Sequence, residues 1–144
     1  MADISPAQQA YLEAIYRLEK AGRAGRVGDI AEEVGVHKSS ATGALQRLRD
    51  RDLVEYAPYE AASLTGKGES VAKQVFAQRI VIRDFLCDVL GVEVEKADSA
   101  ASDLRHGASG EVVGKLACFL AYCRLEDGQG EALSGYHRFL RRAL

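Results

Sequence analysis

Short polar and long basic side chains recur at helical spacing between His37 and Arg51 of this 144-residue chain. Hydroxyl and amide groups can hydrogen-bond to base edges in a DNA groove, whereas lysine and arginine cations pair with backbone phosphates. Apolar residues fill the intervening positions and would form the buried side of the same helix; they are Ala41, Ala44, Leu45 and Leu48. The pattern predicts a helix whose outer face carries Lys38, Ser39, Thr42, Gln46, Arg47, Arg49 and Arg51.

The charge of this segment differs from that of the whole chain. Residues 37–51 hold four basic residues and one acidic residue, a balance of +3, whereas the formal net charge of the protein is −2. A basic face on an acidic body is compatible with specific DNA binding and argues against non-specific coating of DNA. A dimer would present this face twice.

A second helix and a hairpin should hold the polar helix in place. Residues 28–34 carry apolar positions at helical spacing, and Asp29 can cap the free amides of that helix. Gly35 should end it, because glycine enters the left-handed conformation without a steric penalty. A short helix, a glycine turn and a second helix with a polar N-terminus form a helix-turn-helix pattern.

The segment after the polar helix predicts a wing. Residues 52–56 are strand-like, residues 57–60 form a turn, and residues 61–65 can return as a second strand. A hairpin at this place is the wing of a winged helix, which normally rests on the DNA backbone. Thr65 should cap a long helix that begins at Gly66.

The remaining segments are predicted to be helical. One helix should begin at Ser5 or Pro6 and end near residue 21, and others should span residues 66–90, 93–106, 109–122 and 131–144, with a loop at 127–130. The second half of the long helix is apolar around much of its circumference, which indicates a homodimer interface. The fold class is mainly α with a small β-wing: a winged helix-turn-helix domain over residues 1–68 and a helical dimerisation domain over residues 69–144.

Composition and motifs narrow the class of protein. The apolar share of 47% and the charged share of 28% are ordinary for a globular protein. No apolar run approaches the roughly 18 residues of a membrane span, and no secretory signal is recognisable, so we expect a cytoplasmic protein without a membrane partner. The chain lacks a Gly-rich phosphate loop, an HExxH motif and a nucleophile elbow, so we do not expect an enzyme.

Several stretches together resemble one known family. YLEAIYRLE, GDIAEEVGVHKSSATGALQRL, DLVEY and LTGKG, followed by an apolar helical half, are similar to the diphtheria-toxin-repressor and manganese-transport-regulator family. The resemblance extends from about Tyr11 to Tyr122 and fits the short branch without an SH3-like domain. It implies a homodimeric, metal-responsive repressor that binds a palindromic operator in double-stranded DNA, with Mn²⁺ or Fe²⁺ as cofactor.

The resemblance also implies DNA-contacting positions. Those that match are His37, Lys38, Ser39, Ser40, Thr42, Gln46 and Arg47, and the position of Arg49 on the same face adds a further cation. Lys38, Arg47 and Arg49 should meet phosphates, whereas the shorter side chains can approach base edges. Gly43 departs from the family, which places a longer polar residue there.

The implied metal site is altered. The matching positions read Ala10, Glu13, Arg79, Arg83, Asp98, Ser102, Arg105 and His106. Glu13 and His106 keep the ligand type, and Asp98 matches an ancillary position. A guanidinium donates no lone pair and repels a dication. We therefore hypothesise that Arg79 or Arg105 pairs with Glu13 in place of the metal, so that the protein binds DNA without metal. In the alternative interpretation these arginines are solvated surface charges.

Other sensing or binding modes remain open. Cys87, Cys118 and Cys123 could form a redox switch or an iron–sulfur ligand set with His106. No CxxC is present, and intracellular cysteines more often behave as small buried apolar residues. A winged-helix protein-interaction module without DNA binding is a further alternative. The basic residues between Lys38 and Arg51 argue against this alternative, because a module that binds only protein does not need a positively charged face there.

Overall fold

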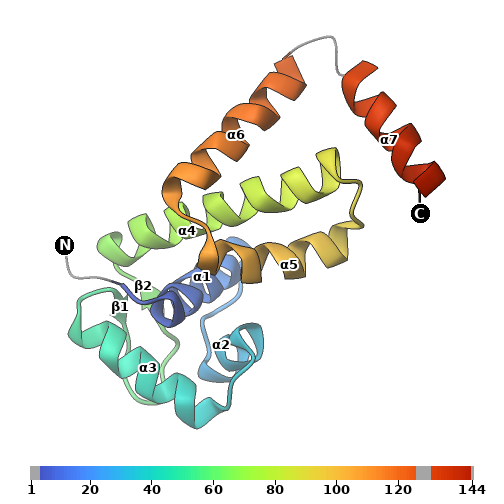
Figure 1. Ribbon diagram of the computed structural model, residues 1–144. Helices are drawn as coiled ribbons and strands as arrows, with labels where there is room; N and C mark the ends of the chain where they lie inside the picture. The colour runs from blue at the N-terminus through green and yellow to red at the C-terminus, as the bar shows by residue number, and fades with distance from the viewer. Residues whose placement is uncertain (1–3, 126–130, 144) are drawn as a thin grey trace. The chain divides into compact units, whose positions relative to one another are not determined.

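Helices and one short hairpin make up the described part of the chain, residues 4–125 and 131–143 of the computed structural model (Figure 1). The chain divides into two units, Met1–Phe76 and Ala77–Leu144. Helix α4 (Gly66–Asp84) contributes residues to both units, so the division falls within a helix and later than residue 68. The mainly α fold with a small β-wing is confirmed.

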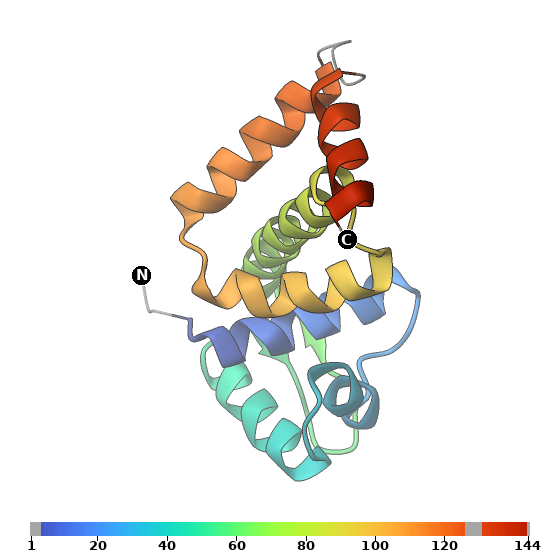
Figure 2. The same cartoon turned by 45° about the vertical axis from the view of Figure 1, so that its right-hand side comes forward.

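Unit 1 is built around helix α1 (Pro6–Lys20), which packs against the two helices that follow it (Figures 1 and 2). Its start is a capping box: the Gln8 amide donates to Ser5 Oγ at 3.3 Å, and the Ser5 amide donates to Gln8 Oε1 at 3.1 Å. Leu12, Ile15 and Leu18 are fully buried and form the centre of the core.

Helices α2 (Val27–Val34) and α3 (Lys38–Asp50) form the helix-turn-helix. Gly35 ends α2 in the left-handed conformation with φ of 76°, as predicted. The prediction that Asp29 caps α2 is wrong, because the helix already begins at Val27 and its N-cap is Arg26. Asp29 lies inside the first turn, where its carboxylate forms a 3.4 Å ion pair with Arg23.

The predicted wing is an antiparallel pair, β1 (Val54–Glu55) and β2 (Ser63–Leu64), with Val54 opposite Leu64. The pairing is short, and an isolated bridge between Gly25 and Ala62 extends it toward the segment before α2. The predicted cap of α4 is confirmed, since the Gly68 amide donates to Thr65 Oγ1 at 3.0 Å.

Unit 2 contains the second half of α4, a π-helical segment η1 (Phe85–Val89), α5 (Val94–Gly107), α6 (Gly110–Leu125) and α7 (Glu131–Ala143). The long predicted helix is therefore α-helical to Asp84 and π-helical over its last turn. Gly91 follows with φ of 69° and reverses the chain toward α5. The small core of this unit is formed by Ile82, Ala101 and Val113.

The last predicted elements are also present. Ser109 Oγ accepts from the Val112 amide at 3.3 Å, which confirms it as the cap of α6. The final helix is α7, and the predicted loop at 127–130 lies outside the described residues. No helix in the described ranges is long and apolar enough to cross a membrane.

Candidate nucleic-acid interface and sensor positions

One side of α3 is buried in unit 1 and the other side faces solvent. Ala41, Ala44, Leu45 and Leu48 are buried, as their spacing predicts. The predicted DNA-contacting residues lie on the opposite side: His37 is the N-cap, and Lys38, Ser39, Ser40, Gln46, Arg47 and Arg49 are exposed. The helix therefore presents polar groups along its length and the free amides of its N-terminus at one end.

The hydroxyl of Thr42 is already engaged within α3. Thr42 Oγ1 donates to the Lys38 carbonyl oxygen at 3.0 Å, which uses the hydroxyl proton. Its lone pairs stay available, so at a base edge Thr42 can act only as an acceptor. Ser39 and Ser40 stand earlier in the helix and are more exposed than Thr42.

The cations of α3 are not equivalent. Arg49 donates to the neighbouring Asp50 carboxylate through Nε at 3.2 Å and Nη2 at 2.9 Å, which offsets its charge. Arg51 donates to Gln8 Oε1 at 2.5 Å and so ties the end of α3 to the start of α1. Arg49 and Arg51 thus have partners within the protein, a distinction that the sequence pattern does not reveal.

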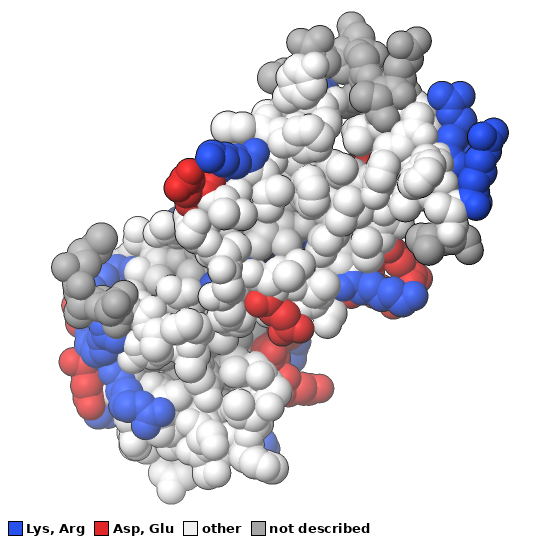
Figure 3. All heavy atoms as spheres, viewed as in Figure 1, with Lys and Arg blue, Asp and Glu red and all other residues white. Residues whose placement is uncertain are grey.

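Figure 3 shows lysine and arginine side chains gathered over α3, with an acidic side chain among them. A second basic group lies over α7 in the same view.

Gly43 leaves a gap in the exposed side of α3: a Cβ added there would meet only Arg47 Nη1, at 3.6 Å. The position is open, so the departure from the family at Gly43 changes the side chain without changing the packing.

The altered metal positions of unit 2 carry direct protein contacts. Arg79 Nη2 donates to Asp98 Oδ2 at 2.5 Å, and the Arg79 side chain is only 8% exposed. Arg105 is also buried, at 5% exposure, and its Nη2 lies 3.2 Å from His106 Nε2. The interpretation of Arg79 and Arg105 as solvated surface charges is therefore wrong, since both side chains are buried.

The first-helix positions lie in the other unit. Glu13 is buried, and Ala10 is partly exposed. The pairing of Glu13 with Arg79 or Arg105 stays a prediction. In unit 2, Ser102 is partly exposed and Arg83 is bound to Asp84 at 2.7 Å.

The described residues contain no ready-made cluster of metal donors. Within the described residues of either unit, no three His, Cys, Asp or Glu side chains lie together as a metal would require. Structural and regulatory Mn²⁺ or Fe²⁺ sites need several oxygen or nitrogen donors with free lone pairs. Asp98 and His106 each have such a donor atom bonded to an arginine instead.

The three cysteines are free thiols that differ in exposure. Cys118 is exposed, and Cys87 and Cys123 are partly buried. Burial raises the pKa of the Cys87 thiol, and the nearby Asp88 carboxylate raises it further. Because the thiolate is the reactive form, this environment disfavours reaction at Cys87.

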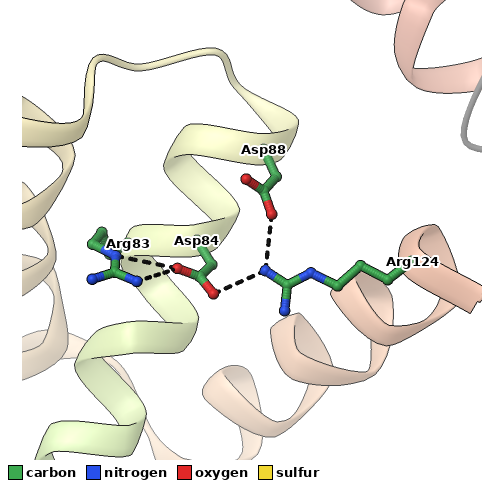
Figure 4. A network of polar contacts seen from close by, with 4 residues as sticks. All are labelled: Arg83, Asp84, Asp88 and Arg124. Atoms are coloured by element: carbon green, nitrogen blue, oxygen red, sulfur yellow. Dashed lines mark hydrogen bonds and ion pairs between the residues drawn. The ribbon is translucent and has the colours of Figure 1, made fainter.

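Unit 2 also contains a network of charged side chains that the sequence did not predict. Arg124 Nη2 lies 2.9 Å from both Asp84 Oδ2 and Asp88 Oδ2, and Arg83 donates to Asp84 Oδ1 (Figure 4). Burial alone would raise the pKa of Asp84, but hydrogen bonds from Arg124 and Arg83 outweigh it and hold the pKa below its usual value. The network joins α6 to the junction of α4 and η1.

Two family models match the chain in succession. "Iron dependent repressor, N-terminal DNA binding domain" matches residues 3–62, and "Iron dependent repressor, metal binding and dimerisation domain" matches residues 65–131. Together they extend over nearly the whole chain, in the order that the sequence motifs predict.

Known proteins show the same relationship. The chain is 28% identical over 134 residues to the HTH-type transcriptional regulator MntR of Bacillus subtilis (strain 168), which covers 93% of this chain and 94% of that protein. The corresponding regulator of Bacillus velezensis is 27% identical over 134 residues, with the same coverage.

Solved structures match the fold. The manganese regulator SloR has a TM-score of 0.68 and 27% identity, over 80% of this chain and 54% of that chain. IdeR of T. acidophilum has a TM-score of 0.72 and 19% identity, over 78% of this chain and 53% of that one. This chain thus spans about half the length of those structures but nearly all of the MntR regulators. With both family models matched in order, the chain belongs to the iron-dependent repressor family.

Proposed function

We propose that the protein is a sequence-specific DNA-binding transcriptional repressor of metal-homeostasis genes. The observation that carries this proposal is the two-sided nature of α3, buried along one face and polar and cationic along the other. Support comes from the match of residues 3–62 to a DNA-binding domain and from the relatives, which are transcriptional regulators. Such a regulator acts in the cytoplasm, has no membrane partner and is not an enzyme.

The side chains of α3 have distinct roles in this proposal. Lys38 and Arg47 contact phosphates and set the position of the helix, with a weaker contribution from Arg49 because Asp50 offsets its charge. His37, Ser39, Ser40 and Gln46 approach base edges from the start and middle of the helix, and Thr42 accepts a hydrogen bond there.

The protein acts as a homodimer on a palindromic operator. Helix α6 leaves Val112, Phe119 and Tyr122 exposed, and such large apolar side chains are best covered by another protein surface. The match of residues 65–131 to a dimerisation domain supports a second copy of the chain as that surface. Two recognition helices would then enter successive major grooves about 34–36 Å apart.

The sensor differs from that of the metal-regulated relatives. The family implies Mn²⁺ or Fe²⁺, yet Arg79 and Arg105 are buried at positions where the resemblance expects ligands. We propose that DNA binding by this protein does not depend on either metal. A redox or iron–sulfur sensor is less well supported, because the described residues hold no group of three His, Cys, Asp or Glu side chains that could bind a metal and because burial raises the pKa of the Cys87 thiol.

DNA binding is tested by fluorescence anisotropy on duplex DNA from upstream of the gene that encodes the protein and on unrelated duplex DNA. We expect tighter binding to the upstream DNA. Arg47→Ala should weaken binding to both DNAs similarly and reduce the slope of log affinity against log salt by about 1. The matched control is Lys115→Ala, which removes an exposed cation of α6 paired with Glu111.

Two results would contradict the proposal. If wild-type protein binds neither DNA, the chain is a winged-helix interaction module rather than a DNA-binding regulator. If Arg47→Ala weakens binding to the upstream DNA alone, Arg47 reads bases and its assignment to a phosphate is wrong.

A further inference from the structure

We infer that two guanidinium groups of the chain take the place of a metal ion in unit 2, where they bind the donor atoms that a metal would use. This inference rests on the proposed function and specifies how its sensor is altered. Its basis is two contacts made by side chains of α5: Asp98 with Arg79 of α4, and His106 with Arg105.

The first contact joins two helices. Arg79 belongs to α4 and Asp98 to α5, and their Nη2 and Oδ2 atoms are 2.5 Å apart. The arginine side chain is 8% exposed, whereas that of Asp98 is 37% exposed. A buried guanidinium requires an anionic partner, and the Asp98 carboxylate supplies one across the gap between the helices.

The second contact removes a nitrogen donor. A guanidinium can only donate, so at 3.2 Å from Arg105 Nη2 the His106 Nε2 atom must accept. The Nε2 lone pair that could bind a metal is therefore directed at Arg105.

Electrostatics favours the same conclusion. A dication near Asp98 or His106 would lie beside a permanent, buried cation, and to use the same donor atom it would have to displace that cation. The displaced guanidinium would be left in a buried position without that bond, which is unfavourable. Unlike a bound metal, the guanidinium is present at every metal concentration.

The consequence for function is a permanent connection between α4 and α5. In a metal-activated protein, such a connection would form only when the ion binds. Here Arg79 and Asp98 make it in the folded chain itself. The protein should therefore bind its operator equally well with a chelator and with Mn²⁺.

The test compares operator affinity and thermal unfolding of the full chain with EDTA and with Mn²⁺. Wild type should show neither a shift in Tm nor a change in affinity. Arg79→Glu would place a second carboxylate beside Asp98, so the two would repel each other and create an oxygen site. This variant should unfold at lower temperature and bind the operator at least tenfold more weakly, and Mn²⁺ should restore both.

Two further variants show whether a response to Mn²⁺ comes from the added carboxylate at position 79 or from the change in charge. Arg79→Gln removes the charge without supplying a carboxylate, so it should lower Tm with no recovery in Mn²⁺. Lys96→Glu makes the same charge change on α5 at an exposed residue paired with Glu93, and its Tm should not respond to Mn²⁺. If Lys96→Glu responds as Arg79→Glu does, the effect is general charge screening and the inference fails.

The wild-type result alone can overturn the inference. If wild type binds the operator only with Mn²⁺, or gains thermal stability from it, the arginines do not replace a metal and the proposed metal independence fails, although the proposed role as a DNA-binding repressor stands. If wild type binds no DNA under either condition, it is the proposed function that fails. If Arg79→Glu does not fold, the comparison of wild type in EDTA and in Mn²⁺ still tests the inference.

Discussion

Gly68 lies directly against the backbone of Leu53. A Cβ at Gly68 would stand 1.9 Å from the Leu53 carbonyl oxygen and 2.9 Å from its carbonyl carbon. The same oxygen accepts from the Thr65 amide at 3.2 Å. The first turn of α4 therefore packs against the segment between α3 and β1, and only glycine allows this approach.

Gly68→Ala should lower the stability of unit 1 by about 3 kcal/mol or more, because the added methyl group overlaps backbone atoms that cannot rotate away. Urea unfolding followed by circular dichroism would measure the loss. Gly66→Ala is the matched control, since nothing lies within 4 Å of a Cβ there. Equal stability of the two variants would show that the α4–Leu53 contact is not rigid.

Gly43→Ala should have the opposite effect. Gly43 lies inside α3, and an added Cβ makes an ordinary contact with Arg47 Nη1 at 3.6 Å. Alanine stabilises a helix interior by about 1 kcal/mol relative to glycine, so the Tm should rise by several degrees. A fall in Tm would mean that the backbone at Gly43 needs a freedom that alanine lacks.

The Asp84–Arg124 contact predicts a dependence of stability on pH. The pKa of Asp84 is held below its usual value in the folded protein, so its contribution to stability is present above about pH 4 and is lost as the pH falls through the folded pKa. Arg124→Gln should therefore lower Tm at pH 7, and the difference from wild type should shrink below about pH 4.

The expected size of that effect is small. Arg124 is 53% exposed, and solvent screening limits such pairs to about 1 kcal/mol or less. Lys115→Gln, which disrupts the exposed pair with Glu111, serves as the control for loss of a surface cation. A Tm difference that persists unchanged at pH 3 would mean that Arg124 stabilises the unit by packing rather than by its charge.

Local patterns predicted much of the fold. The spacing of Ala41, Leu45 and Leu48 gave the orientation of α3, because a helix with one apolar face has a single way to be buried. Thr65 and Ser109 were predictable as caps, because a cap bonds to an amide only three residues away. The short strands also followed from local pattern, although their pairing is only two residues long.

Contacts between distant residues were not predictable. Arg51 and Gln8 are 43 positions apart, and Arg124 and Asp84 are 40 apart, so no periodicity relates them. The family resemblance suggested that Arg79 or Arg105 pairs with Glu13, whereas the structure adds a contact of Arg79 with Asp98, 19 residues away. The π-helical turn also has no signal in the hydrophobic pattern.

That turn has a consequence for the length of the chain. In η1 the Leu90 amide donates to the Phe85 carbonyl oxygen, five residues back, so this turn holds one residue more than an α-helical turn does. Deleting one residue between Phe85 and Val89 would bring this turn to the length of an α-helical turn, because it removes the extra residue that the π-helical bond spans.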